Sequence, residues 1–330
     1  MITIEELRAA AIPFALPMRR PFRGITVREG VLINGPSGWG EFAPFDDYSP
    51  AAAGRWLSSA IEAAYGSWPK PLRGTVPVNA IIPSVGPDDA ATLTREAVLD
   101  RGCTTIKVKV GQSLIEDEAR VASIRDALDA TLGRGEGRIR LDANGLWSLD
   151  EAKRSLRRLS AYGLEYVEQP CAGFDDLRSL RAAIDVPIAV DETIRTSADP
   201  QSVRVREVAD IAILKAAPLG GARSLLAIAE RVGVPVVVSG SLDSAVGLDS
   251  GVAAAAALGQ LPFACGLGTG ALFVEDLTAT PRVPVSGFLP VGRTTPDLDA
   301  LLAARERVTS ERVGYWDARL VEAWPFAVKG

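Results

Sequence analysis

The sequence of 330 residues contains no histidine. Histidine is the usual base that activates serine and cysteine nucleophiles and is a common zinc ligand, so its absence excludes Ser-His-Asp, Cys-His and zinc-His chemistry. The groups left for moving protons or binding a metal are lysines and carboxylates. Only three cysteines occur, Cys103, Cys171 and Cys265, without C-x-x-C spacing. We therefore expect small buried side chains rather than a disulfide framework or a structural zinc site.

The sequence also has no large excess of one charge and no long apolar run. The chain has 36 basic and 41 acidic residues and no basic tract, so we expect no nucleic-acid partner. The longest apolar run, GVAAAAALG at 251–259, is too short to span a bilayer, and the opening residues MITIEELRAA lack the pattern of a secretory signal. We therefore expect a cytoplasmic protein with no membrane partner, and favour a monomer over an oligomer.

From residue 75 onward, short β-rich segments alternate with longer helical ones. Eight candidate strands lie at 76–82, 104–110, 138–142, 164–168, 187–191, 211–215, 234–240 and 262–267. One helical segment between them, 148–159, opens with the capping-box residues Ser148 and Glu151. Eight alternations of strand and helix are typical of a (β/α)8 barrel, so we predict an α/β fold with the barrel at 75–279.

Residues 1–74 do not follow this rhythm. Their pattern predicts β-segments with turns, followed by a helix from 50 to about 65. We therefore predict an α+β capping domain ahead of the barrel. The segment 280–330 ends in a charged helix and is expected to pack back on that domain. A capping-domain loop with Arg20, Phe22 and Arg23 could close the barrel mouth, although the arginines are as readily explained as solvated surface residues.

The stretch TTIKVKVG at 104–111 has three aliphatic residues on one strand face and Thr105, Lys107 and Lys109 on the other. An edge strand with its lysines in water is one explanation. However, polar residues also end the strands that follow: Asp142, Glu168, Asp191, Lys215 and Ser239. Since the carboxyl ends of barrel strands carry the active site, we expect all these side chains to point into the barrel mouth.

Asp142, Glu168 and Asp191 end three successive strands and are therefore expected to be neighbours. Three converging carboxylates repel one another unless a cation compensates them. Ligands that are all oxygen atoms fit Mg²⁺, with Mn²⁺ as the second choice. The alternative is that each carboxylate forms a separate salt bridge, to Arg138, Arg140 or a neighbouring lysine.

Lys109 precedes this trio and Lys215 follows it, so the two lysines are expected on opposite sides of a closed barrel. This arrangement suits proton abstraction next to a carboxylate, with a lysine as base. Lys107 is expected to lower the pKa of Lys109 as a neighbouring cation. The spacing leaves open which lysine is the base. A Schiff-base aldolase with Lys215 as nucleophile and a non-catalytic binding scaffold are the competing functions.

Five motifs, taken in order, resemble the enolase superfamily and its muconate-lactonizing subgroup: KVK (107–109), DAN (142–144), EQP (168–170), DET (191–193) and LKAAPLGG (214–221). The resemblance covers nearly the whole chain and implies a modified (β/α)-barrel with an α+β capping domain. It implies that three carboxylates bind Mg²⁺, that Lys109 is the base and then the acid, and that Lys215 is a cation facing a planar intermediate.

Within the subgroup, GWGEFAPFDDYS at 38–49 and the compact length are most similar to the dehydratases of menaquinone biosynthesis. This resemblance implies a carbon–oxygen lyase that converts 2-succinyl-6-hydroxy-2,4-cyclohexadiene-1-carboxylate to 2-succinylbenzoate by syn dehydration. CGLGTGAL at 265–272 lacks the Asp-x-Asp pattern of dipeptide epimerases but leaves N-acylamino acid racemases as an alternative. Asn144, Ser239, Gly240 and Ser241 are expected to contact this small carboxylate substrate, unless they are strand-end turns.

Overall fold

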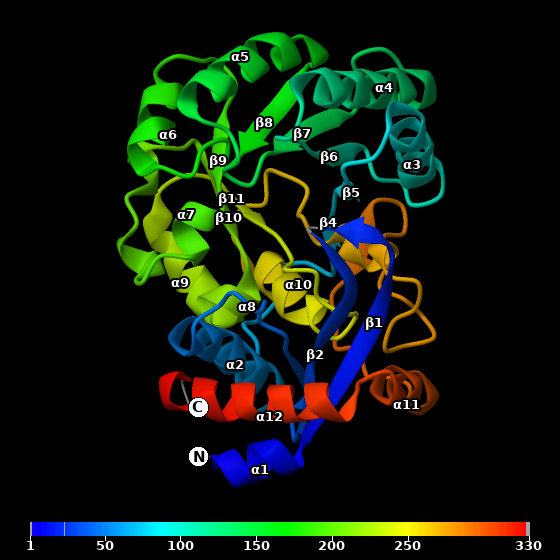
Figure 1. The fold of residues 1–330 in the computed structure, drawn as a ribbon, viewed down its shortest axis with the longest axis vertical. Coiled ribbons are helices and arrows are strands. Elements are labelled where there is room, and N and C mark those ends of the chain that lie inside the picture. Colours follow the sequence, from blue (N-terminus) through cyan, green and yellow to red (C-terminus); the bar gives the residue numbers. More distant parts are fainter. Residues whose placement is uncertain (1, 23, 328–330) are drawn as a thin grey trace.

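The computed structural model describes residues 2–22 and 24–327. A curled parallel sheet of seven strands forms its centre, in the order β11-β10-β9-β8-β7-β6-β5 (Figure 1). Its strands are β5 (Ala80–Ile82), β6 (Thr105–Lys109), β7 (Arg138–Asp142), β8 (Leu164–Glu168), β9 (Ile188–Val190), β10 (Ile211–Leu214) and β11 (Val236–Val238). An eighth segment closes the barrel, because Cys265 bridges Val78 beside β5 and Gly266 bridges Ser239 beside β11, both in parallel.

The predicted α/β barrel is confirmed, but two of the eight predicted strands differ. The segment 262–267 forms only single bridges, since Pro262 has no N–H to donate and Gly266 has no side chain to pack. The segment 76–82 divides in two: β4 (Thr75–Pro77) leaves the barrel to pair antiparallel with β12 (Phe288–Pro290), and only β5 joins the sheet. The barrel is therefore regular around β6 to β10 and irregular where it closes.

Helices cover the outside of the sheet. They are α3 (Pro87–Leu99), α4 (Leu114–Leu132), α5 (Leu149–Leu159), α6 (Phe174–Arg181), α9 (Ala222–Val232) and α10 (Leu248–Ala257). The short helices α7 (Glu192–Arg195) and α8 (Ala216–Leu219) follow the carboxyl ends of β9 and β10 and contact the N-terminal part of the chain. The capping box predicted for α5 is present, because Ser148 and Glu151 each accept a hydrogen bond from the other's backbone N–H. The outward strand residues Ile106, Val108 and Leu141 are fully buried in this layer, which leaves the alternate residues to face the barrel interior.

The N-terminal unit, called the capping domain here, comprises α1 (Ile4–Ala9), an antiparallel sheet of β1 (Ala11–Phe22), β2 (Ile25–Gly35) and β3 (Gly38–Phe42), and α2 (Pro50–Tyr65). Helices α11 (Leu298–Glu306) and α12 (Ser310–Ala323) lie beside it: α11 contacts β1, and α12 contacts α2 (Figure 1). Arg8 and Asp317 form an ion pair of 2.7 Å between α1 and α12. The exact division of the chain at residues 74 and 279 stays a prediction.

Short 3-10 turns complete the chain: η1 (Ser160–Tyr162), η2 (Pro200–Ser202), η3 (Val205–Glu207), η4 (Gly268–Leu272) and η5 (Trp324–Phe326). The cysteines Cys103, Cys171 and Cys265 are buried and unpaired, as expected from their spacing. Among the helices in the described ranges, none is both long and apolar enough to pass through a bilayer.

Candidate active site

Most of the polar residues at the strand ends line one small cavity at the carboxyl end of the barrel, whereas Glu168 and Asp191 contact its lysines from outside the cavity wall. The cavity has a volume of about 30 Å³, and its wall consists of Phe22, Phe45, Ile81, Lys107, Lys109, Asp142, Asn144, Lys215, Ser239, Gly240, Ser241, Leu242 and Thr269. Eight of these residues were predicted as catalytic, metal-binding or substrate-binding. Period-two alternation and the barrel rhythm therefore bring together side chains from five different strands and their following loops.

Lys107 lies between two of the predicted metal ligands. Its Nζ is 2.8 Å from Asp142 Oδ2 and 2.7 Å from each carboxylate oxygen of Glu168. The strand register explains this position, because Asp142 and Glu168 are directly paired across β7 and β8. Burial works to lower the pKa of Lys107, but the two carboxylates outweigh it and raise that pKa above its ordinary value. Lys107 is therefore a fixed cation at the centre of the site.

Lys109 contacts the same carboxylate from the next inward position of β6. Its Nζ donates to Asp142 Oδ2 at 2.6 Å and to Asn144 Oδ1 at 2.7 Å, and lies 5.3 Å from the centre of the Phe22 ring. Burial works to raise the pKa of Asp142, but Lys107 and Lys109 outweigh it and lower that pKa below its usual range. The two lysines thus share one oxygen atom. That Lys107 lowers the pKa of Lys109 stays a prediction.

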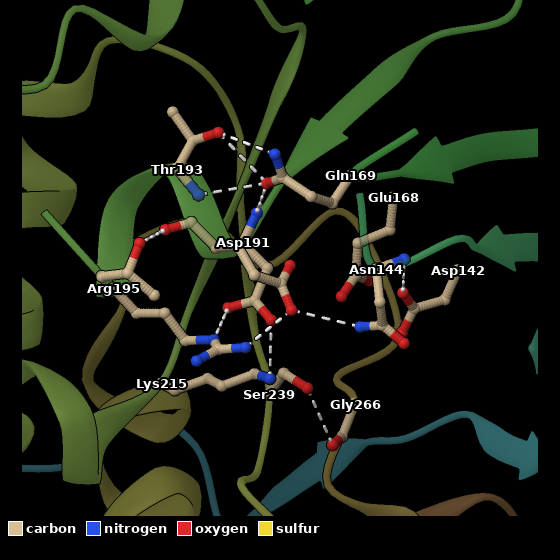
Figure 2. Close-up of polar contacts among 12 residues, drawn as sticks. Asp142, Asn144, Glu168, Gln169, Asp191, Thr193, Arg195, Lys215, Ser239 and Gly266 are labelled. Carbon is tan, nitrogen blue, oxygen red and sulfur yellow. Dashed lines mark hydrogen bonds and ion pairs between the residues drawn. The ribbon is translucent and has the colours of Figure 1, made fainter. Parts of the chain in front are cut away.

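Lys215 enters from the opposite side, because it follows β10, which lies four positions from β6 around the barrel. Its Nζ donates to Asp191 Oδ2 at 2.8 Å, and Arg195 Nε donates to Asp191 Oδ1 at 3.0 Å (Figure 2). Burial works to raise the pKa of Asp191, but these two cations outweigh it and lower that pKa. The predicted placement of two lysines on opposite sides of the site is present in the structure.

The three carboxylates are each 1% exposed, but their partners in this structure are cations of the chain itself. Among residues 2–22 and 24–327, no three Asp, Glu, His or Cys side chains are arranged so that they could hold a metal ion. Lysines compensate the carboxylates, as in the salt-bridge alternative, but the salt bridges are shared rather than separate, because Lys107 contacts both Asp142 and Glu168. The expected alternative of a salt bridge from Arg140 to one of the three carboxylates is wrong, because Arg140 pairs with Glu165 at 2.5 Å in the barrel floor.

The donor set nevertheless suits a hard divalent cation, since it consists of carboxylate oxygens shielded from bulk water. Repulsion within the set is also incompletely balanced. Burial and the charge of Asp142 raise the pKa of Glu168 to about 7, against the opposing effect of Lys107. A further positive charge near Glu168 would relieve this repulsion, so the assignment of Asp142, Glu168 and Asp191 as metal ligands stays a prediction that the donor chemistry supports.

Gln169 is a buried residue of the site that the sequence analysis missed. Its Oε1 accepts hydrogen bonds from the backbone N–H groups of Asp191 and Thr193, both at 3.1 Å, and its Nε2 donates to Thr193 Oγ1 at 2.8 Å (Figure 2). Gln169 has a positive φ of 40°, which turns the chain sharply after Glu168. It therefore joins the end of β8 to the turn that carries Asp191. The middle residue of the EQP motif was the available signal.

Arg195 was also missed, although it lies one helical turn after Asp191 on α7. Besides Asp191, it donates to Glu192 Oε1 at 2.6 Å and to the hydroxyl of Tyr48 from the capping domain. Asn144 Nδ2 donates to the same Glu192 oxygen at 3.1 Å, so the expected substrate contact of Asn144 is here a contact to Lys109 and Glu192. One hydrogen-bonded chain therefore runs from Lys109 to the capping domain.

The capping domain covers the cavity. Phe22, at the end of β1, lines it as the sequence suggested, whereas Arg20 pairs with Asp89 at 2.8 Å outside it, and Arg23 lies outside the described residues. A larger cleft of about 620 Å³ lies next to it between the capping domain and α7, and Phe45 lines both spaces. Because 30 Å³ holds only one or two waters, a substrate can enter only when covering side chains such as Phe45 move.

The comparisons with known proteins agree with this geometry. The family model "Enolase C-terminal domain-like" matches residues 89–296, and "Enolase N-terminal domain-like" matches residues 14–64. The o-succinylbenzoate synthase of Thermobifida fusca (strain YX) is 49% identical over 315 residues, which is 94% of each chain. The o-succinylbenzoate synthase of Mycobacterium tuberculosis (strain ATCC 25177 / H37Ra) is 52% identical over 311 residues, which is 92% of each chain.

Two solved structures show the same fold at lower identity. The muconate lactonizing enzyme from Pseudomonas fluorescens, complexed with muconolactone, has a TM-score of 0.75 and 22% identity, covering 89% of this chain and 97% of that one. The N-succinyl Arg/Lys racemase from Bacillus cereus ATCC 14579 has a TM-score of 0.73 and 18% identity, covering 89% of this chain and 96% of that one. At these identities the likeness concerns the barrel and the capping domain alone.

Proposed function

We propose that the chain dehydrates 2-succinyl-6-hydroxy-2,4-cyclohexadiene-1-carboxylate to 2-succinylbenzoate. The chain belongs to the o-succinylbenzoate synthase family of the enolase superfamily. This reaction is a step of menaquinone biosynthesis and makes the chain a carbon–oxygen lyase. The observation that carries the proposal is the pair Lys109 and Lys215, which enter one closed cavity from opposite sides of the barrel.

Enolase-superfamily enzymes depend on a divalent metal ion. We assign Asp142, Glu168 and Asp191 as the residues that hold Mg²⁺, with Mn²⁺ as the second choice, because they supply only oxygen ligands. When bound, the ion would neutralise the substrate's ring carboxylate and the negative charge that builds up there as the α-proton leaves. Lys107, which now fills the space between Asp142 and Glu168, supplies part of that positive charge from the chain itself.

Lys109 is assigned as the base. The α-proton of the substrate passes to Lys109 Nζ, which Asn144 Oδ1 and Asp142 Oδ2 hold in position. The same Nζ then returns the proton to the substrate's hydroxyl group, the C–O bond breaks, and water leaves while the ring gains its third double bond. Since one group serves both proton transfers, proton and hydroxyl depart from the same face of the ring, which makes the elimination syn.

Lys215 is assigned a different role on the other face. Asp191 holds its ammonium group at 2.8 Å, so Lys215 is positioned as a cation over the planar intermediate. Such a cation–π contact contributes about 0.5 to 2 kcal/mol, depending on how fully it is desolvated. A racemase would instead require Lys215 to exchange protons as Lys109 does. The opposed lysines make this the second candidate function, and a Schiff-base aldolase with Lys215 as nucleophile is the third.

One set of assays separates these functions. Loss of diene absorbance gives kcat/KM for dehydration, and α-deuterium exchange into both enantiomers of N-succinyl amino acids measures racemisation. We expect efficient dehydration, sensitivity to EDTA, and no covalent trapping of substrate by borohydride. Efficient exchange of both enantiomers with negligible dehydration would promote the racemase, and borohydride trapping would promote the aldolase.

We also propose that the enzyme is cytoplasmic, that it acts on a small carboxylate substrate, and that it is a monomer. Light scattering coupled to gel filtration measures the oligomeric state, and fractionation of cells that produce the full chain measures the location. A stable dimer or a membrane-bound fraction would contradict this part of the proposal and leave the assigned chemistry untouched.

A further inference from the structure

Thr269 carries a hydroxyl group that has no explained role in the chain. The residue is 3% exposed, it lines the catalytic cavity, and its Oγ1 has no hydrogen-bond partner among the residues that the structure describes. A buried hydroxyl without a partner costs free energy relative to an apolar group of the same shape, so such groups are rare in folded proteins. A hydroxyl kept at this cost inside a reaction cavity points to a partner that arrives with the substrate.

The backbone holds Thr269 rigidly in place. It lies in η4, between two glycines that touch other backbone segments. A Cβ on Gly268 would lie 2.4 Å from the carbonyl oxygen of Asn79, and a Cβ on Gly270 would lie 2.6 Å from that of Arg282. Only glycine allows the chain to pass so closely on both sides. The GTG sequence therefore fixes the turn that places Thr269 at the cavity wall.

Thr269 follows the eighth barrel segment, which lies across the barrel from β8 and its Glu168. The charged residues of the cavity belong to other walls: Lys107, Lys109, Asp142 and Lys215. On the wall of Thr269 two neighbouring donors are already engaged, since Ser239 Oγ donates to Gly266 O at 3.2 Å and Ser241 N donates to Asp243 at 2.7 Å. No charged side chain of this wall lines the cavity, and the Thr269 hydroxyl remains there as a donor.

We propose that the Thr269 hydroxyl donates a hydrogen bond to an oxygen atom of the substrate's succinyl chain and is a specificity-determining residue of the site. The inference rests on the proposed function, because it takes the ring carboxylate to lie at the carboxylate trio. The succinyl chain then extends away from the trio toward the wall of Thr269. Its keto and carboxylate oxygens are both acceptors, and each loses its hydrogen bonds to water when the substrate enters the cavity. The Thr269 hydroxyl replaces one of these lost donors.

The test is a matched pair of nearly isosteric substitutions. Thr269→Val replaces the hydroxyl with a methyl group, and we expect kcat/KM for dehydration to fall by about 2- to 160-fold, the range for a lost hydrogen bond to a neutral or charged acceptor. The melting temperature should stay equal or rise, because an unpartnered hydroxyl is removed. Thr269→Ser keeps the hydroxyl and should retain most of the activity.

Thr94→Val is the matched control. Thr94 is also buried, but its hydroxyl donates to Ala90 O at 2.7 Å inside α3, remote from the cavity. This variant should melt lower and keep the wild-type kcat/KM. The opposite pattern for Thr269→Val, a lower melting temperature with unchanged kinetics, would show a structural role and overturn the inference. Failure of the proposed function is a separate result, because it would leave the wild-type enzyme itself without dehydration.

Inhibition by product analogues identifies the acceptor. The product 2-succinylbenzoate has both oxygens, 2-butanoylbenzoate keeps only the keto group, and 2-(3-carboxypropyl)benzoate keeps only the terminal carboxylate. If Thr269→Val weakens inhibition by the product and by the keto analogue alike, the keto oxygen is the acceptor. If it weakens inhibition by the product and by the carboxylate analogue, the terminal carboxylate is the acceptor. Equal inhibition constants for variant and wild type with all three compounds would overturn the proposal.

Discussion

Replacing Lys107 with Met tests the electrostatic balance at the centre of the site. Lys107 is 5% exposed, and its ammonium group lies within 2.8 Å of both Asp142 and Glu168. Methionine fills a similar volume without the charge. The substitution therefore leaves two buried carboxylates facing each other without the cation between them, while Lys109 still compensates Asp142 from the other side.

The expected loss of stability follows from these contacts. Removing one partner of a buried ion pair costs about 3 to 5 kcal/mol, because the other charge is left uncompensated. An unfolding entropy of roughly 2.1 cal/mol/K per residue gives about 0.7 kcal/mol/K for 330 residues. The melting temperature should therefore fall by about 4 to 7 °C in EDTA. Saturating MgCl2 should recover more of this loss in the variant than it adds to the wild type, since the ion replaces a missing positive charge.

Differential scanning calorimetry with EDTA and with MgCl2 measures both effects. Lys70→Met, at an exposed loop position, is the matched control and should melt like the wild type under both conditions. If Lys107→Met also melts within about 1 °C of the wild type in EDTA, the ion pairs do not stabilise the fold. If MgCl2 fails to stabilise the variant, the assignment of the carboxylate trio as the metal site is refuted.

Three further predictions concern single groups. Glu168→Gln, nearly isosteric, should abolish dehydration and metal binding by calorimetry while the circular dichroism spectrum stays native; retained metal affinity would contradict the assignment. Lys109→Ala should lower kcat by at least about 10² to 10⁴-fold, because both proton transfers use this group, and a smaller loss in a stopped-flow assay would move the base elsewhere. Burial and the charge of Asp243 raise the pKa of Glu41 to about 7, above its value near 4.5 in the unfolded chain. Protonated Glu41 therefore favours the folded state below pH 4.5, and this contribution to stability is lost as the pH rises to 7. Glu41→Gln should therefore become more stable relative to the wild type from pH 5 to pH 8, and a melting-temperature difference that does not change with pH would contradict this.

The sequence predicts those parts of the site that depend on regular periodicity. Lys107 and Lys109 share a strand face because alternate residues must, and Asp142 and Glu168 are neighbours because each ends its strand at the same sheet edge. These relations need no knowledge of side-chain conformation. The cavity therefore contains eight of the predicted site residues, drawn from strands that lie far apart in the chain.

The parts that the sequence does not predict depend on rotamers and long-range packing. Lys107 reaches between two carboxylates through its side-chain torsions, which strand alternation does not specify. Arg195 meets Tyr48 across 147 residues of sequence and a domain interface. Thr269 lies in a 3-10 turn beyond the eighth barrel segment, where neither a strand nor a helix period applies. Geometry at such places is set by whichever segments pack there.

The contact of α12 with the capping domain has a consequence for biosynthesis. Arg319 on α12 donates hydrogen bonds to the carbonyl oxygens of Phe45 and Tyr48, the segment that covers the catalytic cavity. Tyr48 and Arg319 are 271 residues apart, so a ribosome adding about 5 to 20 residues per second makes the second roughly 14 to 54 s after the first. The barrel strands and both catalytic lysines are made within that interval, before the arginine that anchors the segment over the cavity. A nascent chain therefore acquires its reacting groups before it acquires the means to enclose a substrate.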